Sequence, residues 1–382
     1  MSQKRKIIRA TTVPTSLETF CKDMLRELSE KYDVLAVSSP GADLELVARR
    51  EGVRAEAVEM KRHIAPLADL KSLWHLVRLM RRERPWMVHS MTPKAGLLCM
   101  LAAKMTGVPV RVHTFTGLVW PTATGLKRRL LMATDGLLCA CATHVIPEGL
   151  GVKRDIERAG ITRKPMRVLA NGNVRGIDPE YYDRTAEVMA VAGKIRKPGV
   201  MTFVYVGRLV GDKGINELVE AFVRLEKECK SIRLLLVGRG EPHLDPLRPE
   251  IWKMIENNPD IEAVGEQEDV RPWMAASDVL AFPSYREGFP NVVIEAGAMG
   301  LPSIVTDING SNEIVIPGEN GVIIPPHDAD ALYAAMREMC DNEGKCNYMA
   351  GNARRLVVER YGCRLVRDSL YRFYDSVETK WR

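Results

Sequence analysis

Two glutamates, Glu287 and Glu295, flank a loop that contains glycine and proline. A carboxylate accepts paired hydrogen bonds from vicinal hydroxyls, so one glutamate could hold a sugar and the other a ribose. The backbone between them opens a predicted helix, where free N–H groups can bind an anion. Nucleotide-linked sugars combine these features, and the candidate donor-binding residues of the loop are Gly288, Phe289, Pro290 and Asn291. The alternative is that both glutamates are ordinary acidic residues on a helix surface.

The segment that carries this pair has the pattern of a strand, a loop and a helix. The apolar run at 278–282 predicts a buried strand, and Pro283 ends it. Asn291 occupies the position of a helix N-cap, and the helix closes before Pro302. This order places Glu287 on a loop at the carboxyl end of a strand and Glu295 about two turns into the helix.

A second group of chemically capable residues follows the predicted strand at 202–207. Gly207 lets the backbone approach a phosphate, Arg208 offers a planar fork and Lys213 a point charge for a diphosphate. A surface arginine and lysine can equally be solvated. The chain has no Gly-x-Gly-x-x-Gly fingerprint here, so we expect no dinucleotide cofactor.

The first half of the chain offers weaker candidates. His113 is predicted to end a strand, where a packed or capped histidine is the alternative to a catalytic one. The hydroxyls of Thr15 and Ser16, at the start of a predicted helix, could hold an acceptor phosphate, with Lys94 as a second candidate for that task.

Charge is divided unevenly along the 382 residues. Residues 1–175 contain 30 Lys and Arg against 16 Asp and Glu, whereas the remainder contains 25 against 33. A basic half suits a phosphorylated substrate or an anionic membrane surface, and a solvated face is the plain alternative. We expect no nucleic acid partner, because aromatic residues do not alternate with the basic ones. The eight cysteines lack Cys-x-x-Cys spacing and predict buried thiols of a cytosolic protein.

Short apolar runs alternate with helical patterns throughout, which predicts an α/β protein with parallel sheets. We expect helices at 17–32, 44–52, 69–84, 328–340 and 352–381. In the first domain, 1–175, the run at 167–170 is expected to complete the sheet. The stretch 176–200 has the composition of a linker, and the second domain spans 176–365.

The segment from Ser284 to Ala296 resembles the Glu-x7-Glu signature of the family-four retaining glycosyltransferases. These are enzymes of the GT-B fold, which has two Rossmann-like domains with a cleft between them. The resemblance implies that Arg208 and Lys213 stabilise the departing nucleotide diphosphate. It also implies donor contacts at Gly238 and Gly265, and it places the last helix, 366–382, back on the first domain. The loop after the first strand departs from the family's usual Gly-Gly.

The resemblance also implies a histidine near His113 in contact with the donor sugar. Thr116 competes for that position, because some relatives that act on lipid-linked sugars carry a glutamate just before the matching Gly-Leu. The expected catalytic set is then Arg208, Lys213, Glu287 and His113. The acceptor set is Thr15, Ser16, Lys94 and Thr116.

The function implied is that of a retaining, metal-independent hexosyl- or N-acetylhexosaminyltransferase that uses a nucleotide sugar, by preference a UDP-sugar. The basic clusters at 78–84 and 127–129 favour a polyprenyl-diphosphate-linked acceptor in bacterial surface polysaccharide assembly, met at the inner face of the cytoplasmic membrane. The rivals are a nucleotide-sugar 2-epimerase of the same fold and a non-catalytic nucleotide-sugar-binding subunit. No Asp-x-Asp stands beside the predicted sugar site, so no metal is expected.

Overall fold

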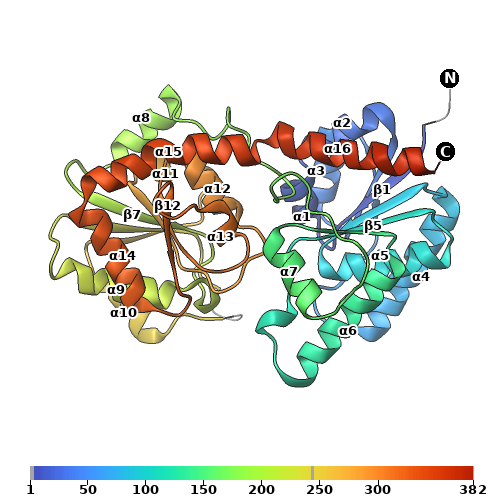
Figure 1. Ribbon diagram of the computed structural model, residues 1–382, viewed down its shortest axis with the longest axis horizontal. Coiled ribbons are helices and arrows are strands. Elements are labelled where there is room, and N and C mark those ends of the chain that lie inside the picture. The colour runs from blue at the N-terminus through green and yellow to red at the C-terminus, as the bar shows by residue number, and fades with distance from the viewer. Residues whose placement is uncertain (1–3, 242–244, 382) are drawn as a thin grey trace. The chain divides into compact units, whose positions relative to one another are not determined.

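The protein, seen in a computed structural model, is described for residues 4–241 and 245–381. The predicted first domain and last helix therefore extend beyond the described residues at Met1 to Gln3 and at Arg382. The chain divides into unit 1, Met1–Gly176 with Arg364–Arg382, and unit 2, Ile177–Cys363. Each unit is built on one six-stranded sheet (Figure 1).

The sheet of unit 1 is parallel, with the strand order β3-β2-β1-β4-β5-β6. Its strands are β1 (Lys6–Ala10), β2 (Asp33–Ser38), β3 (Arg54–Ala57), β4 (Met87–Met91), β5 (Val110–Phe115) and β6 (His144–Pro147). The helices are α1 (Pro14–Cys21), α2 (Met24–Lys31), α3 (Ala42–Glu51), α4 (Pro66–Glu83), α5 (Pro93–Met105), α6 (Gly125–Cys141), α7 (Leu150–Arg158) and α16 (Cys363–Lys380), with a 3-10 turn η1 (Trp120–Thr122).

The sheet of unit 2 is also parallel, with the order β12-β11-β10-β7-β8-β9. Its strands are β7 (Met201–Val206), β8 (Ile232–Val237), β9 (Ile261–Gly265), β10 (Val279–Phe282), β11 (Ser303–Thr306) and β12 (Gly321–Ile324). The helices are α8 (Ala186–Ile195), α9 (Ile215–Glu226), α10 (Pro249–Asn257), α11 (Arg271–Ala275), α12 (Asn291–Ala298), α13 (Ser311–Ile314), α14 (Ala329–Asp341) and α15 (Glu343–Tyr361), with a 3-10 turn η2 (Gly211–Lys213).

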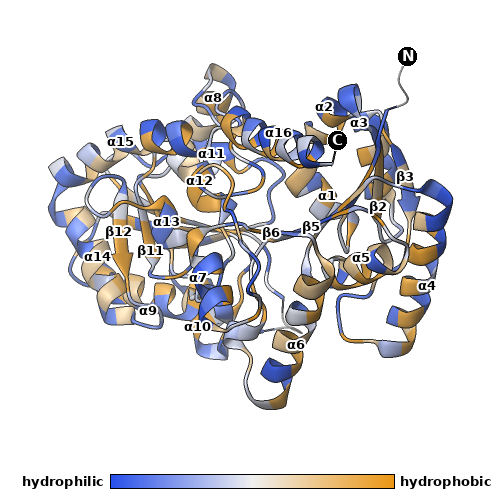
Figure 2. Cartoon of the chain, turned by 45° about the vertical axis from the view of Figure 1, so that its right-hand side comes forward, coloured by the Kyte–Doolittle hydropathy of each residue, from blue (hydrophilic) through white to orange (hydrophobic). Residues whose placement is uncertain are grey.

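Helices cover the central strands of both sheets, which explains why those strands are apolar along their whole length. All six residues of β8 are buried, and so are all four of β10. Strands buried on both faces show continuous apolar runs, the pattern from which the parallel sheets were predicted. In Figure 2 the strands are mostly hydrophobic, whereas outer helices such as α4 and α15 carry both hydrophobic and hydrophilic residues. The prediction of two Rossmann-like α/β sheets is confirmed.

The boundaries differ from the predictions at four places. The helix expected at 17–32 is two helices, because Asp23 has a left-handed φ of 61°. Residues 167–170 do not form a strand, and of these four only Ala170 makes an isolated bridge, to Gly172. The stretch expected to be a linker contains α8, whose first turn is capped by the Thr185 hydroxyl. The helix expected at 352–381 breaks at Gly362, where the Cys363 N–H donates to Ile177 O.

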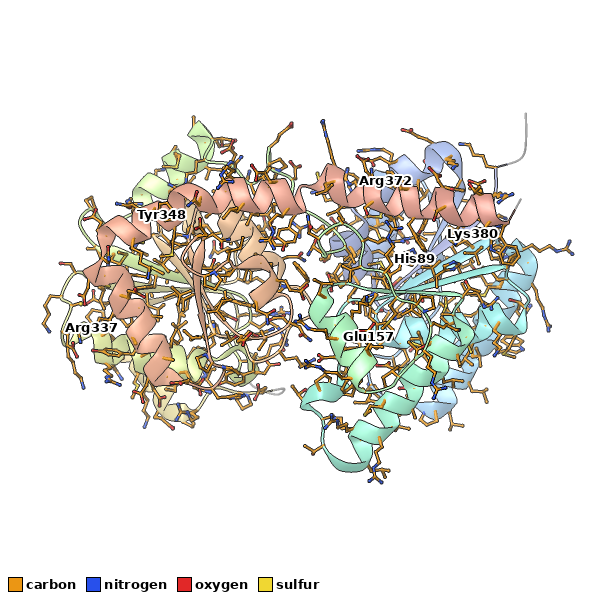
Figure 3. All side chains as sticks on the ribbon, viewed as in Figure 1. His89, Glu157, Arg337, Tyr348, Arg372 and Lys380 are labelled. Atoms are coloured by element: carbon orange, nitrogen blue, oxygen red, sulfur yellow. The ribbon has the colours of Figure 1, made fainter. Side chains whose placement is uncertain are left out.

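Helix α16 packs against the unit 1 sheet through apolar and polar contacts. Leu370, Phe373 and Val377 belong to the core that also contains Ile7 of β1. The Tyr374 hydroxyl lies 2.7 Å from His89 Nδ1 and 2.9 Å from the Arg9 guanidinium. Figure 3 shows His89 in the interior of the unit. The C-terminal helix is therefore part of the unit 1 core.

Candidate nucleotide-sugar site

The predicted donor residues of unit 2 lie near the point in the sheet where the strand order reverses. Strand β7 lies between β8 and β10, so the chain winds one way from β7 to β9 and the other way from β10 to β12. The loops that follow β7 and β10 therefore lie side by side at the carboxyl edge of the sheet. Open α/β sheets bind ligands at such a switch point.

Lys213 and Glu287 meet at this point. Lys213 ends η2, after β7, and its Nζ lies 2.5 Å from Glu287 Oε1 in the loop after β10. The same carboxylate oxygen accepts a hydrogen bond of 2.8 Å from the hydroxyl of Ser284, which is fully buried. Both ionic side chains are about 15% exposed, Lys213 at 14% and Glu287 at 17%. The structure thus brings together two residues that are 74 positions apart in the sequence.

The two loops are fixed to each other through their backbones. The Tyr285 N–H donates to Asp212 O over 2.9 Å. Gly214 has a φ of +70°, and a Cβ there would lie 2.1 Å from Pro283 O, so only glycine allows this approach. The Arg286 guanidinium lies 3.6 Å from the Asp212 carboxylate. The lysine and the glutamate are therefore held by rigid backbone and not by side-chain packing alone.

Three of the predicted glycines line the carboxyl edge of neighbouring strands. The Gly207 N–H donates to Val237 O at 2.9 Å, and the Gly238 N–H donates to Gly265 O at 2.8 Å. A Cβ on Gly238 would lie 1.8 Å from Gly207 O. The ends of β7 and β8 therefore pack too closely for a side chain at Gly238, and backbone alone forms this part of the edge.

Arg208 precedes Lys213 by five residues, but it pairs with a different carboxylate, that of Glu241. Its guanidinium donates to Glu241 Oε2 at 2.8 Å, and its side chain is 47% exposed. Burial alone would lower the pKa of Arg208, but the hydrogen bond and the charge of Glu241 outweigh it, and the pKa is raised. The arginine is fully charged, and about half of its side chain is exposed.

The loop and helix after Glu287 correct two expectations. Pro290, and not Asn291, is the N-cap of α12, so Asn291 is the first helical residue and Glu295 lies little more than one turn in. Phe289 is 5% exposed and contacts Tyr361 edge-to-face at 5.4 Å, so its side chain is part of the core. Gly288 O and Phe289 Cα would both be within 2.7 Å of a Cβ on Gly310. Glu295 is 9% exposed.

His113 lies inside β5 and not at its end, followed in the strand by Thr114 and Phe115. Its ring is 1% exposed, and its Nδ1 lies 2.9 Å from the Ser90 hydroxyl. A Cβ on Gly96 of α5 would lie 2.4 Å from the ring, which shows how tightly the helix covers it. Burial lowers the pKa of His113 to about 3. In this conformation the imidazole is a neutral core group, covered by helix.

Two of the four predicted acceptor residues line a pocket of unit 1. Ser16 of α1 and Lys94 of α5 line a pocket of about 460 Å³. Thr15 is exposed and turns to Asp43, with a hydroxyl-to-carboxylate distance of 3.5 Å. Thr116 follows β5 directly, next to the pocket residue Gly117. Lys94 Nζ is 2.5 Å from Asp69 Oδ2, so its charge already has a partner.

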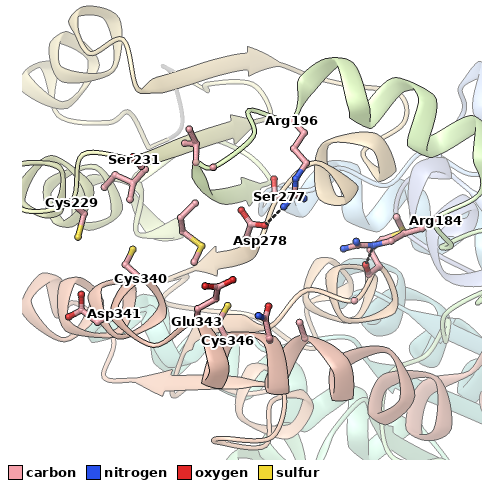
Figure 4. Close-up of a pocket in the computed structure, with 18 of the residues that line it drawn as sticks. Arg184, Arg196, Cys229, Ser231, Ser277, Asp278, Cys340, Asp341, Glu343 and Cys346 are labelled. Carbon is pink, nitrogen blue, oxygen red and sulfur yellow. Dashed lines mark hydrogen bonds and ion pairs between the residues drawn. The ribbon is translucent and has the colours of Figure 1, made fainter.

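A larger pocket, of about 1030 Å³, lies at the opposite edge of the unit 2 sheet, where β7 and β8 begin (Figure 4). Arg196 donates to Asp278 at 2.8 Å there, and three thiols line it, those of Cys229, Cys340 and Cys346. None of the predicted site residues lines this pocket.

Sequence reasoning missed the residues that support the site. Asp245 holds the β7 loop, because its Oδ2 accepts from the Asp212 N–H at 2.6 Å and its carbonyl from the Gly211 N–H at 3.1 Å. Asp69 and Asp135, which line the unit 1 pocket, were also missed. Ser284 is the first residue of the segment that resembles the Glu-x7-Glu signature. Its position three residues before Glu287 was the only sequence feature that could have indicated its role.

Comparisons with known proteins point in one direction. Residues 201–342 match a family model described as "Glycosyl transferases group 1", and residues 17–172 match one described as "Glycosyl transferase 4-like domain". Capsular polysaccharide biosynthesis glycosyltransferase CapM of Staphylococcus aureus is 29% identical over 377 residues, 98% of each chain. The UDP-Gal:alpha-D-GlcNAc-diphosphoundecaprenol alpha-1,3-galactosyltransferase of Escherichia coli is 28% identical over 305 residues, 78% of each chain.

Among solved structures, Alr3699/HepE of Anabaena in complex with UDP superposes with a TM-score of 0.81. It shares 18% identity and covers 97% of this chain and 100% of its own. At that identity the likeness concerns the fold, and it confirms the predicted GT-B architecture of two Rossmann-like domains. Each half of the chain thus matches a glycosyltransferase domain model, and Lys213 and Glu287 lie within the matched part of unit 2.

Proposed function

We propose that this chain, whose halves match 4-like and group 1 glycosyl transferase domains, is a glycosyltransferase that moves a sugar from a UDP-sugar to a lipid-linked saccharide. The observation that carries the proposal is the Lys213–Glu287 pair at the β7/β10 switch point, beside the start of α12. An ammonium that is 14% exposed, closely packed backbone at the strand ends and a helix N-terminus together suit a diphosphate. The carboxylates add acceptors for hydroxyl groups.

In the proposed reaction the configuration at the anomeric carbon is retained. The bond from that carbon to the diphosphate oxygen breaks, and a new bond to the acceptor oxygen forms on the same face, with the hydroxyl proton passing to the departing phosphate. Lys213, Arg208 and backbone amides neutralise the charge that develops on the diphosphate, a role that metal ions fill in other enzymes. Glu295 would hold the ribose and Glu287 the transferred sugar. No enzymic nucleophile is required.

The lipid-linked acceptor is supported by the acceptor named for the E. coli relative and by the surface of α4. Leu67, Leu70 and Trp74 are 87%, 65% and 53% exposed, and the Arg78 guanidinium stacks over Trp74 at 4.6 Å. Apolar side chains beside cations suit peripheral contact with an anionic bilayer. Within residues 4–241 and 245–381, no helix has the length and apolarity to cross a membrane. We propose that the enzyme acts at the inner face of the cytoplasmic membrane, in surface polysaccharide assembly.

Two experiments test the proposal. A thermal-shift panel of UDP, GDP, ADP and CMP with their sugar conjugates should give the largest rise in Tm for UDP and for one UDP-sugar, because a ligand of the folded state stabilises it. Mass spectrometry should then detect transfer from that sugar to a short-chain alkyl GlcNAc diphosphate. An α-configured product from an α-configured donor supports retention. A parent protein that neither binds a nucleotide nor transfers a sugar would remove the proposal.

Membrane contact is tested separately by vesicle flotation. The protein should float with vesicles containing phosphatidylglycerol and not with pure phosphatidylcholine, and the Leu70→Ser/Trp74→Ser variant should stay in solution. The matched control replaces Leu365 of α16, which is 36% exposed, by serine. Equal flotation of parent and double variant would contradict the assignment of the α4 surface.

A further inference from the structure

A second pocket of unit 1 lies at the amino edge of its sheet. Its lining includes Lys6 and Asp33, the first residues of β1 and β2, and Trp86 and Pro109, which directly precede β4 and β5. Its volume is about 1270 Å³. None of the predicted site residues lines this amino-edge pocket, because they follow the strands at the carboxyl edge. The pocket is therefore separate from the candidate site and from the proposed acceptor residues.

Positive charge dominates the lining of the amino-edge pocket. Two carboxylates, those of Asp33 and Glu83, stand against six cations, which are Lys4, Arg5, Lys6, Arg81, Arg82 and Arg84. The lining therefore has an excess of four positive charges. Cations in the last turn of a helix stabilise its dipole, which accounts for Arg81 and Arg82 at the end of α4. That explanation does not apply to the cations at the start of β1.

The two carboxylates of the lining are already neutralised by close partners. Lys6 Nζ lies 2.7 Å and Arg54 Nη2 lies 3.1 Å from Glu83 Oε2, and Arg82 Nε lies 3.1 Å from Glu83 Oε1. Arg54 Nη2 is also 3.3 Å from the Asp33 carboxylate. The hydrogen bond from Lys6, with those from Arg54 and Arg82, outweighs burial and lowers the pKa of Glu83 to about 2. Glu83 is thus ionised at neutral pH and fully occupied.

Two of the cations pair with carboxylates outside the lining. Arg82 Nη2 lies 2.9 Å from Glu56 Oε2. Arg5 Nη1 lies 3.6 Å from Glu378 Oε1, and its guanidinium stacks over the Trp86 ring at 4.9 Å. The cations without a carboxylate partner are therefore Lys4, Arg81 and Arg84.

Lys4, Arg81 and Arg84 leave the pocket with uncompensated charge. Lys4 Nζ donates to a neutral acceptor, Ser29 O, at 2.7 Å. Over residues 4–241 and 245–381, the side chains of Arg81 and Arg84 form no ion pair or hydrogen bond, and both are exposed. Helices α4 and α5 end at this edge, and each dipole places roughly half a negative charge there, which is less than the charge of these three cations.

We propose that the amino-edge pocket binds an anion with two or more phosphate groups. Guanidinium forks match phosphate oxygens in pairs, and an ammonium adds a point charge. The pocket is larger than the roughly 300–1,000 Å³ of ordinary small-molecule pockets, so it suits an extended anion and not a single phosphate. Soluble oligophosphates and neighbouring headgroups of an anionic bilayer both present this chemistry. The site is independent of the glycosyltransferase reaction.

Calorimetry with tripolyphosphate tests the soluble source. Saturating UDP is added to keep the probe away from Lys213. The parent should bind, and Arg81→Gln/Arg84→Asn should raise the Kd at least about tenfold, the value of a hydrogen bond between charged groups. Asparagine is chosen at position 84 because it tolerates the left-handed φ of 46° there. The matched control Arg49→Gln/Arg372→Gln removes the same charge from exposed positions of α3 and α16 and should keep the parental Kd.

Flotation with phosphatidylglycerol vesicles tests the headgroup source with the same variants. A raised Kd for tripolyphosphate with parental flotation assigns the pocket to a soluble anion, which is the result we expect. Lost flotation with no effect on tripolyphosphate assigns it to headgroups, and effects in both arms assign it to both. Parental behaviour of Arg81→Gln/Arg84→Asn in both arms would overturn the proposal, as would an equal loss in the matched control or a parent that binds neither probe. Because parent and variants are compared directly, these outcomes hold whether or not UDP binds.

Discussion

Lys213 Nζ lies 2.5 Å from Glu287 Oε1, although one residue follows β7 and the other β10. The pair depends on the strand order, since β7 and β10 are neighbours in the sheet while 72 residues lie between the end of β7 and the start of β10 in the chain. A diphosphate bound at this switch point would share the ammonium with the carboxylate, which is already fixed by Ser284. The lysine is held in place before the ligand arrives, which is the property expected of an electrostatic catalyst.

Removal of the ammonium should affect turnover much more than folding. Lys213→Ala is expected to lower kcat by about 10²–10³, the effect of losing one preorganised charge in a transition state. Its Tm should change by only a few degrees. Initial rates and thermal unfolding measure the two effects, and Lys227→Ala, at the exposed end of α9, is the control. A parental kcat in Lys213→Ala would show that the pair is structural.

Glu295 should contribute to nucleotide binding. Its side chain is 9% exposed, and it lies in the second turn of α12, the helix whose start belongs to the proposed diphosphate site. Glu295→Gln keeps the shape and removes the charge, and should raise the Kd for UDP about 10- to 100-fold. Glu256→Gln on α10, which is exposed, is the control for titration calorimetry. Unchanged UDP affinity in the folded variant would remove Glu295 from the donor site.

The glycine at the loop contact should be required for the site geometry. Gly214→Ala introduces a Cβ 2.1 Å from Pro283 O at a φ of +70°, and should cost about 2–4 kcal/mol of unfolding free energy. Gly199→Ala has a similar φ of +73° but nothing within 4 Å of the new Cβ, so it should cost only about 1 kcal/mol. Urea unfolding compares the two variants. Equal losses would show that backbone strain, and not the contact with Pro283, governs the loop.

The sheets were predictable because their central strands are buried on both faces. Runs such as Leu234 to Val237 are continuous and apolar, and β7 and β8 are each followed by a glycine, Gly207 and Gly238. The helix breaks were not predictable. Asp23 adopts its left-handed φ in a backbone whose N–H donates to Glu51 Oε1 at 3.0 Å, and that partner is 28 residues away.

The candidate site was predictable in its residues but not in its pairing. The glutamates and the cations stood out by type and spacing, whereas the contact of Lys213 with Glu287 depends on strand order, which local patterns do not contain. The role of Glu241 as partner of Arg208 has the same origin. His113 was predicted to end a strand, but β5 extends two residues further, to Phe115, and both of these residues are buried.

Acid should destabilise unit 1 through its buried imidazoles. Burial lowers the pKa of His113 to about 3, and burial with the nearby Arg9 lowers that of His89. A histidine whose pKa is lowered on folding stabilises the fold above its unfolded value of about 6.5, and that stability is lost as pH falls towards the folded value. His113 alone should therefore contribute a loss of about 2 kcal/mol between pH 7.5 and pH 5.

The variant His113→Asn separates this effect from ordinary packing. It should be less stable than the parent at pH 7.5, because a buried ring is lost, but its stability should fall less between pH 7.5 and pH 5. Urea unfolding at the two pH values measures both quantities. His63→Asn, an exposed position before α4, should retain the parental pH slope. If His113→Asn kept the full parental slope, the ring would be protonated in the folded protein at pH 5, and it could then reach solvent and an anionic donor.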